Sequence, residues 1–209
     1  PFLYVNLLGE RYANEDAPFG YTANQDIAQP GAWKWTVWDA NWDKDKDKMH
    51  GTVCEKMVKT PLWNNKAYDH FKGKGVIVEA DTLEALADKM QVPRAAFVAT
   101  VKRYNELVQK GVDEDFGKDP AKLTAIVKPP FGACKTGAGL LVTMDGLRIN
   151  TDLQVLDAES KPIDGLYAAG NASGDFFCND YPITTTGISH GRAYTFGWLA
   201  GEKVAALKG

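Results

Sequence analysis

The sequence predicts an α+β fold, and three kinds of segment carry this prediction. Short β-type runs with alternating or continuous apolar residues occur near both ends of the chain. Two amphipathic helical patterns lie between residues 81 and 110, and a third helical run, rich in small residues, lies between residues 187 and 201. With 209 residues, 44% of them hydrophobic, the chain can bury a core in one or two domains.

The first part of the chain is expected to alternate strands with loops. Residues 2–6 and 33–39 are typical of strands, the second with aromatic alternation at its start. Residues 7–14 are interpreted as a turn and a short strand, and residues 15–31 as a loop. Asp and Lys alternate in residues 41–50, which indicates a solvated loop or the start of a helix.

The sequence does not decide the secondary structure of the next segment, but it clearly marks two helices after it. Residues 51–70 fit a helix or an irregular segment, and their periodicity does not choose between them. Asp81 and Glu84 have capping-box spacing for a first helix. Pro93 suits the first turn of a second helix, and Gly111 is expected to end it.

From about residue 128 the composition changes, and a second domain is expected over residues 128–209, after a first one over residues 1–127. Two prolines and a glycine at residues 129–132 mark the crossing. The β-type runs of the second domain are residues 140–143, 147–150 and 153–156, with Asp145-Gly146 as a hairpin turn signal.

The segment from Gly165 to Gly201 carries most of the chemistry. It begins with a buried-strand pattern at residues 166–169, continues through a polar loop and ends in a helix expected to start near residues 185–189. Each glycine inside that helix costs roughly 1 kcal/mol relative to alanine, so we expect another group to approach the helix closely. The N-terminus of such a helix suits an anionic or electron-rich ring edge.

Composition excludes several classes of function. A formal charge of −3 and a pI near 5.7 argue against nucleic-acid binding. Cys54, Cys134 and Cys178 are widely spaced, with no CxxC or histidine-rich pattern, so neither a disulfide framework nor a metal site is expected. The interleaved lysines of residues 44–48 would repel a divalent cation. No apolar run approaches the roughly 20 residues of a membrane-spanning helix.

Four motifs together resemble one family. GLYAAG at residues 165–170 and TFGWLAG at residues 195–201 resemble the FAD-binding segment of flavoproteins related to fumarate reductase, succinate dehydrogenase and 3-ketosteroid dehydrogenase. GERYANE at residues 9–15, and TVKRYN at residues 100–105 with GVDEDFG at residues 111–117, are similar to elements of that family's substrate-capping domain.

The resemblance implies an architecture. Residues 1–127 would form the substrate-capping domain, and residues 128–209 the C-terminal strands and terminal helix of a Rossmann-like FAD-binding domain. The cofactor would be FAD. The family's GxGxxG motif, whose glycines let the backbone approach the FAD pyrophosphate, does not occur in this sequence. The chain is therefore interpreted as the C-terminal part of a larger flavoprotein, with the N-terminal FAD-binding half as its partner.

The resemblance also implies cofactor-binding residues. Gly170 and Asn171 would approach the ribityl or pyrophosphate region of FAD, and the backbone of Ser189 and His190 the pyrimidine end of the flavin ring. His190 fits a cofactor-side or packing role better than that of an acid or base. Asp180 and Arg192 could form a structural ion pair.

The catalytic residues implied by the ketosteroid dehydrogenase branch are Tyr181 and Gly187, carried over together with Asn171 and Ser173. The loop here is slightly longer than in that branch. Tyr181 would exchange a proton with the substrate or donate a hydrogen bond to its carbonyl oxygen, and the N–H of Gly187 would polarise the same carbonyl. The structural alternative is that Tyr181 is a packed loop aromatic.

Three positions that handle the substrate carboxylates in fumarate reductases differ in this chain. Residues 16–21 contain no arginine, the histidine position within residues 140–146 is apolar, and the third position falls on or near Tyr181. The prediction is therefore an oxidoreductase that transfers a hydride between flavin N5 and a carbon–carbon bond conjugated to a carbonyl, with a substrate other than fumarate.

The substrate is expected to be a small molecule with apolar or aromatic, enone-like character. This expectation rests on aromatic residues in the first domain, which could also be core residues: Phe19, Tyr21, Trp33, Trp35 and Trp38. The alternative hypothesis is that the chain, without a dinucleotide-binding half, is a non-catalytic binding module.

Overall fold

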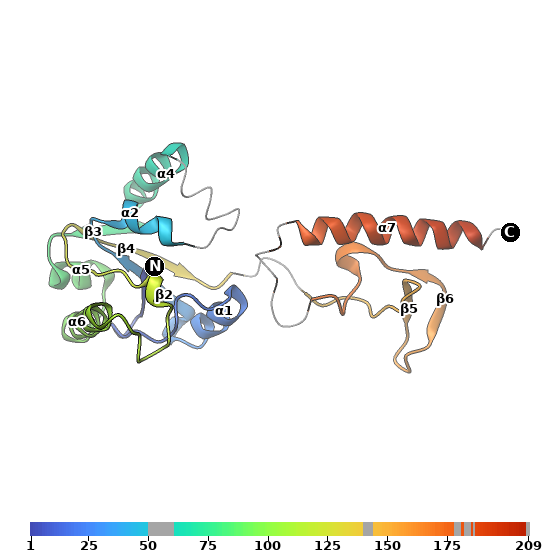
Figure 1. Ribbon diagram of the computed structural model, residues 1–209, viewed down its shortest axis with the longest axis horizontal. Coiled ribbons are helices and arrows are strands. Elements are labelled where there is room, and N and C mark those ends of the chain that lie inside the picture. Colours follow the sequence, from blue (N-terminus) through green and yellow to red (C-terminus); the bar gives the residue numbers. More distant parts are fainter. Residues whose placement is uncertain (50–60, 140–143, 178–180, 182–184, 186, 208–209) are drawn as a thin grey trace. The chain divides into compact units, whose positions relative to one another are not determined.

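The computed structural model describes the chain except for residues 50–60, 140–143, 178–180, 182–184, 186 and 208–209. It divides into two compact units, Pro1–Gly139 (unit 1) and Leu140–Gly209 (unit 2) (Figure 1). Helices and strands are mixed in both, which confirms the α+β class. Of the described residues, no helix is both long enough and apolar enough to cross a membrane.

Unit 1 is built on an antiparallel four-stranded sheet with the order β1-β2-β4-β3 (Figure 1). The strands are β1 (Leu3–Asn6), β2 (Trp33–Trp38), β4 (Phe131–Gly137) and β3 (Ile77–Ala80). The strands predicted near residues 2–6 and 33–39 are confirmed. Because β4 pairs with both β2 and β3, unit 1 continues to Gly139 rather than ending at the expected boundary, residue 127.

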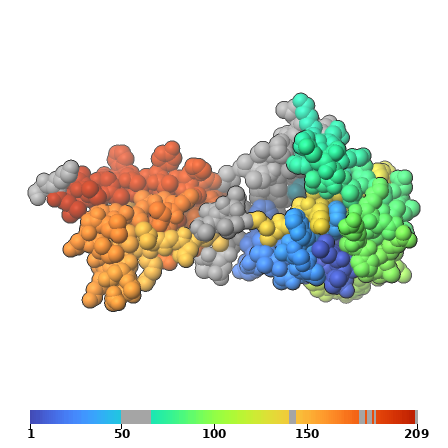
Figure 2. Space-filling model, turned by 180° about the vertical axis from the view of Figure 1, so that it is seen from behind, coloured from blue at the N-terminus to red at the C-terminus, as the bar shows by residue number. Residues whose placement is uncertain are grey.

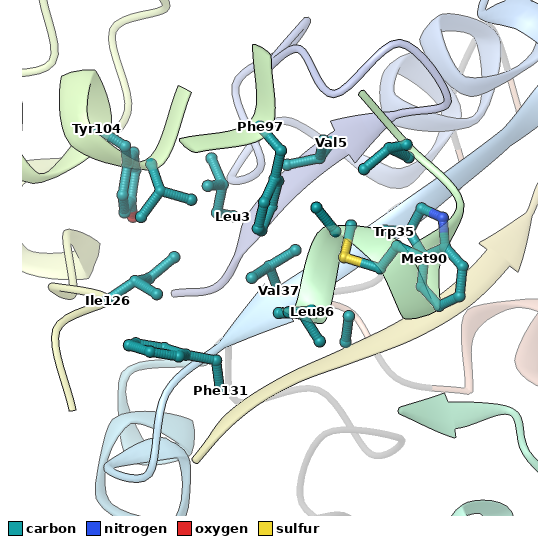
Figure 3. Close-up of a cluster of buried hydrophobic side chains, with 14 of the residues drawn as sticks. Leu3, Val5, Trp35, Val37, Leu86, Met90, Phe97, Tyr104, Ile126 and Phe131 are labelled. Atoms are coloured by element: carbon teal, nitrogen blue, oxygen red, sulfur yellow. The ribbon is translucent and has the colours of Figure 1, made fainter. Parts of the chain in front are cut away.

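One face of this sheet forms the core of unit 1. Side chains from β1, β2 and β4 pack there against α5 (Leu83–Met90) and α6 (Arg94–Lys110) (Figure 3). The most buried members are Leu3, Val5, Val37, Leu86, Ala87, Phe97, Val101 and Ala133. Since side chains alternate along a strand, the neighbours of these residues lie on the opposite face of the sheet.

The two helices begin and end close to the predicted residues. The N-cap of α5 is Thr82 and not Asp81, since the Thr82 hydroxyl accepts a hydrogen bond from the N–H of Ala85 at 3.1 Å. Pro93 directly precedes α6, and Gly111 ends it in the left-handed conformation at φ +72°. The predicted capping box is thus displaced by one residue, while both helices are confirmed.

The interpretation of residues 7–14 as containing a strand is wrong. The side-chain oxygen of Asn6 accepts hydrogen bonds from the N–H groups of Leu8 and Glu10, and Gly9 takes a φ of +81°. These bonds satisfy the backbone locally and hold a turn in place of a strand.

The interpretation of residues 15–31 as a loop is also wrong. This segment contains α1 (Phe19–Ile27) and a 3-10 turn, η1 (Pro30–Ala32). The buried residues of α1 are Thr22 and Asp26, both polar, so no apolar periodicity marks the helix in the sequence.

Short helices complete unit 1. The helix start expected within residues 41–50 is present as α2 (Trp42–Asp45) with η2 (Lys46–Lys48). Residues 51–70 include the beginning of α4 (Pro61–Gly73), while the part at residues 51–60 lies outside the described residues. A last 3-10 turn is η3 (Pro120–Lys122).

Unit 2 pairs β5 (Gln154–Leu156) with β6 (Pro162–Tyr167) and contains η4 (Gly170–Ala172) and the helix α7 (Ile188–Ala206). Both β5 and the final helix were predicted. The strand expected at residues 166–169 is displaced toward residue 162, and most of its residues are exposed rather than buried. Among the described residues it pairs with the short β5.

The other β-type runs of unit 2 have mixed outcomes. Residues 147–150 form only isolated bridges, Leu147 to Ser173 and Ile149 to Val155, and residues 140–143 lie outside the described residues. The hairpin turn expected at Asp145-Gly146 stays a prediction, because one of its strands lies outside the described residues. Gly146 packs against Gly174, where a Cβ on Gly146 would lie 2.8 Å from the Gly174 nitrogen.

A buried ionic cluster joins distant parts of unit 1. Arg11 donates to both carboxylate oxygens of Glu15 at 2.8 and 2.9 Å, and to both of Asp113 at 2.9 and 2.7 Å. The ammonium of Lys118 lies 3.2 Å from Glu15, and its side chain is fully buried. Burial opposes ionisation of Asp113, but hydrogen bonds from Arg11 and from the N–H of Lys118 outweigh it and lower the pKa of this carboxyl to about 2.

The lowered pKa of Asp113 predicts acid sensitivity of unit 1. A pKa that falls from the ordinary 3.8 to about 2 on folding stabilises the folded state above pH 4. That contribution, roughly 2 kcal/mol, is lost as the pH falls from about 4 to 2. In urea unfolding followed through β2 amide signals, Asp113→Asn should therefore cost roughly 3–5 kcal/mol at neutral pH and clearly less near pH 2.5.

The exposed Glu114 provides a matched control, because it pairs with Lys110 at the surface. Glu114→Gln should change the free energy of unfolding by less than about 1 kcal/mol. An equal loss for Asp113→Asn at both pH values would contradict the lowered pKa.

Candidate functional site

Four of the six predicted site residues meet at the beginning of α7 in unit 2. Gly187 caps the helix with a φ of +83°. The N–H of Ser189 donates to the hydroxyl oxygen of Tyr181 at 3.3 Å, and the Ser189 hydroxyl donates to the side-chain oxygen of Asn171 at 2.8 Å. The first turn of a helix presents N–H groups without intrahelical partners and a partial positive charge. The cluster can therefore bind an electron-rich group.

Gly170 allows η4 to lie close to α7. It takes a φ of +64°, and a Cβ at this position would lie 3.2 Å from the Cβ of Ala193 on α7. Its carbonyl oxygen accepts a hydrogen bond from the Ser173 hydroxyl at 2.8 Å. Gly170 thus sets η4, and with it Asn171, against the helix.

His190, in the first turn of α7, is exposed. The structure describes no contact of its side chain. The expectation that its backbone lies near the flavin ring, with a cofactor-side or packing role for the residue, stays a prediction.

Arg192 is a site residue whose role the sequence did not reveal. It is 5% exposed, and its guanidinium donates to the backbone oxygen and to the hydroxyl of Ser173. The rings of Phe176 and Phe196 lie 4.7 and 5.5 Å from its central carbon. Burial lowers the pKa of this guanidinium. The partner suggested by the sequence, Asp180, lies outside the described residues.

The close approach expected along α7 is found at one point only among the described residues. Gly170 meets Ala193, whereas a Cβ on Gly191, Gly197 or Gly201 would meet no atom within 4 Å. Figure 2 shows α7 in red along one side of unit 2, where its large apolar side chains are exposed. These include Tyr194 at 81% and Trp198 at 72%.

The aromatic residues proposed to favour an apolar substrate fall into two groups. Trp35 and Trp38 are buried, so for them the alternative of a core role holds. Phe19, Tyr21 and Trp33 are exposed by 49%, 54% and 45%, which leaves them accessible to a ligand.

Comparison with known proteins places this chain in a family. The family model described as an FAD binding domain matches residues 5–181, most of the chain, and the chain belongs to this family. It is 30% identical, over 98% of its length, to a vinyl phenol reductase of Lactiplantibacillus plantarum, and 32% identical, over 98%, to a 3-oxosteroid 1-dehydrogenase of Mycolicibacterium smegmatis. The chain spans 43% and 38% of these two relatives.

Solved structures agree with this assignment. A 3-ketosteroid Δ1-dehydrogenase from Sterolibacterium denitrificans superposes with a TM-score of 0.76 at 28% identity, with 98% of this chain and 38% of that chain covered. The open conformation of a flavocytochrome c3 fumarate reductase gives a TM-score of 0.67 at 31% identity, with coverage of 98% and 32%. The resemblance to the fumarate reductase and ketosteroid dehydrogenase flavoproteins is confirmed, and FAD is the cofactor.

The residues at the start of α7 fit part of such a cofactor. The helix terminus with Asn171 and Ser189 offers polar groups to an electron-rich ring edge, and Gly170 keeps the backbone of η4 close to the helix. A glycine-rich cradle for the pyrophosphate does not occur in the sequence. These residues fit the flavin side of such a cofactor, and their contact with it stays a prediction.

The contact between Ser173 and Arg192 predicts that loss of the Ser173 hydroxyl lowers the stability of unit 2. Ser173→Ala removes an acceptor from a buried guanidinium and should destabilise unit 2 by roughly 1–3 kcal/mol. Ser189→Ala serves as the control, because its hydroxyl bonds to the exposed Asn171, and should cost less than about 1 kcal/mol. Hydrogen exchange of α7 amides measures both, and equal losses would contradict this role of Ser173.

Proposed function

We propose that this chain is part of an FAD-dependent oxidoreductase that acts on a carbon–carbon bond conjugated to a carbonyl, with a substrate other than fumarate. When bound, FAD supplies hydride exchange at N5. The observation that carries the proposal is the contact between the Tyr181 hydroxyl and the Ser189 N–H at the beginning of α7. Support also comes from the relatives, which are reductases and dehydrogenases.

Tyr181 is proposed to act on the substrate carbonyl or its neighbouring carbon. Its oxygen accepts the Ser189 N–H, and its O–H donates to no other described residue, so the proton is available to a ligand. A hydroxyl in that state can donate a hydrogen bond to a carbonyl oxygen that gains charge, or can transfer a proton. The N–H of Gly187 is the second donor we propose for that oxygen.

The domain roles follow the family. We propose that the N-terminal part, residues 1–127 with β4 added, caps the substrate, and that the rest completes an FAD-binding domain. A neutral hydroxyl and a backbone N–H suit a neutral or singly charged conjugated carbonyl better than a dicarboxylate. This agrees with the changed carboxylate-handling positions in the sequence.

A second candidate is that the chain by itself is a binding module without catalytic activity. The observation that favours it is the lack of a GxGxxG motif in this sequence. A titration of the purified chain with FAD, followed by flavin absorbance and fluorescence, separates the two. Stoichiometric binding with a perturbed flavin spectrum supports a preorganised site, and a folded chain that leaves the flavin spectrum unchanged supports the binding module.

Substitution of Tyr181 tests the catalytic role. In the FAD-loaded protein with an α,β-unsaturated ketone as substrate, Tyr181→Phe should lower kcat by about 100-fold or more, because the group that donates to the carbonyl oxygen is lost. The flavin content should remain unchanged. Phe177→Leu is the control, since Phe177 packs 4.8 Å from the Tyr181 ring and carries no hydroxyl. A kcat lowered equally by both variants would indicate a packing role for Tyr181.

A further inference from the structure

Unit 1 contains a pocket of about 410 Å³ on the face of the sheet opposite its core. Its floor comes from alternate residues of three paired strands: Tyr4 in β1, Lys34 and Thr36 in β2, and Thr136 in β4. Pockets of this volume hold small organic ligands. The same alternation that sends Val5, Trp35 and Val37 into the core thus lines this pocket with polar and aromatic groups.

The walls of the pocket are apolar on one part and charged on another. Phe2, Ala17, Phe19 and Met49 supply apolar surface. Of the residues that the structure describes, the charged side chains that line the pocket are Glu15, Asp16, Lys34, Lys48 and Lys122.

Four of these five charges are already balanced. Glu15 lies in the buried cluster with Arg11 and Lys118, and its side chain is 1% exposed. Asp16 pairs with Lys122 at 2.5 Å. Lys34 pairs at 2.6 Å with Asp26 of α1, and its ammonium also lies 3.9 Å from the centre of the Tyr4 ring.

Lys48 is the exception. Its ammonium donates to the backbone carbonyl of Leu123 at 3.1 Å, and no carboxylate of the described residues lies within ion-pair distance of it. Asp45 acts on it from further away, and burial raises the pKa of that carboxyl. Among the described residues, the side chains of the pocket therefore leave one positive charge without an anionic partner within ion-pair distance.

We propose that this pocket binds a monocarboxylate with an aromatic or apolar body, and that Lys48 is the residue that recognises the carboxylate. The hydroxyls of Thr36 and Thr136 are further donors, since neither bonds to another described residue. The body of the ligand packs against Phe2, Phe19 and Met49. One unmatched ammonium suits a single negative charge, whereas the second charge of a dicarboxylate would find no further unpaired cation among the described lining residues.

Binding to this pocket does not depend on FAD. The further step, that the bound acid is an α,β-unsaturated substrate of the enzyme, rests on the proposed function. Two measurements distinguish these claims: the affinity of the chain without FAD for the acid, and the turnover of the acid by the FAD-loaded protein. If the acid does not bind the chain, the pocket proposal is overturned. If the acid binds but is not turned over, only the proposed function is overturned.

The probe is 3-phenylpropenoate, with its neutral analogue 3-phenylpropenol and the dianion fumarate for comparison. In a titration of the full 209-residue chain followed by amide NMR, the acid should shift signals of Tyr4, Thr36 and Thr136. Lys48→Gln should weaken its binding about tenfold, because a charged hydrogen bond is lost. The neutral alcohol should bind the wild type and Lys48→Gln equally, and fumarate should bind more weakly than the acid.

Lys44→Gln is the matched control. Lys44 lies on the neighbouring α2, is exposed and does not line the pocket, so its loss should leave the affinity unchanged. Unperturbed amide spectra of both variants establish that they fold. The proposal is overturned if the acid binds wild type and Lys48→Gln equally, if the shifts fall outside the pocket, or if both lysine variants weaken binding alike.

Discussion

The buried pairing of Arg11 with Glu15 and Asp113 is the interaction on which unit 1 depends. It joins residues 102 positions apart in the sequence and places three charged side chains where each is 6% exposed or less. A buried ion pair is of uncertain net value, but removal of one partner leaves an unpaired charge and is costly. The segment that follows β1 and the segment that follows α6 are therefore fixed together.

This constraint reaches the pocket through Glu15. Because Arg11 and Lys118 hold its carboxylate, and that carboxylate also accepts the N–H of Tyr4 at 3.3 Å, the next residues have little freedom. Asp16 is then in place to pair with Lys122, and Ala17 to line the pocket. The motif that resembles the family's capping domain thus acts here as a brace for the pocket wall. The charges of its Arg11 and Glu15 are paired within unit 1.

The sequence predicted the elements whose apolar residues repeat with a clear period. β2 and α6 are examples, since Trp35 and Val37 alternate and Phe97, Val101 and Tyr104 keep helical spacing. It missed α1, because the side chains that this helix buries are a threonine and an aspartate. Asp26 is buried there through polar contacts, with the Tyr12 hydroxyl at 2.5 Å and with Lys34. Such pairs depend on tertiary contacts that no local pattern reveals.

The site in unit 2 was predictable to a similar extent. Motif spacing brought out Asn171, Gly187 and Ser189, which the structure places together at one end of α7. It suggested Asp180 as the partner of Arg192, whereas the partners that the structure describes are the backbone oxygen and the hydroxyl of Ser173. An arginine among three phenylalanines, two of them before the helix and one within it, is the signal that could have drawn attention to it.

The two recognition elements proposed here differ in what they contribute to a reaction. A hydroxyl and an N–H at the start of α7 act on an oxygen that gains negative charge as the reaction proceeds, so their effect is largest in the transition state. The ammonium of Lys48 would meet a carboxylate charge that the ligand carries before any reaction, so its contribution is to affinity alone. The first contribution depends on the flavin chemistry, and the second does not. The family's carboxylate-handling positions can therefore differ in this sequence, while Asn171, Gly187 and Ser189 remain together at the start of α7.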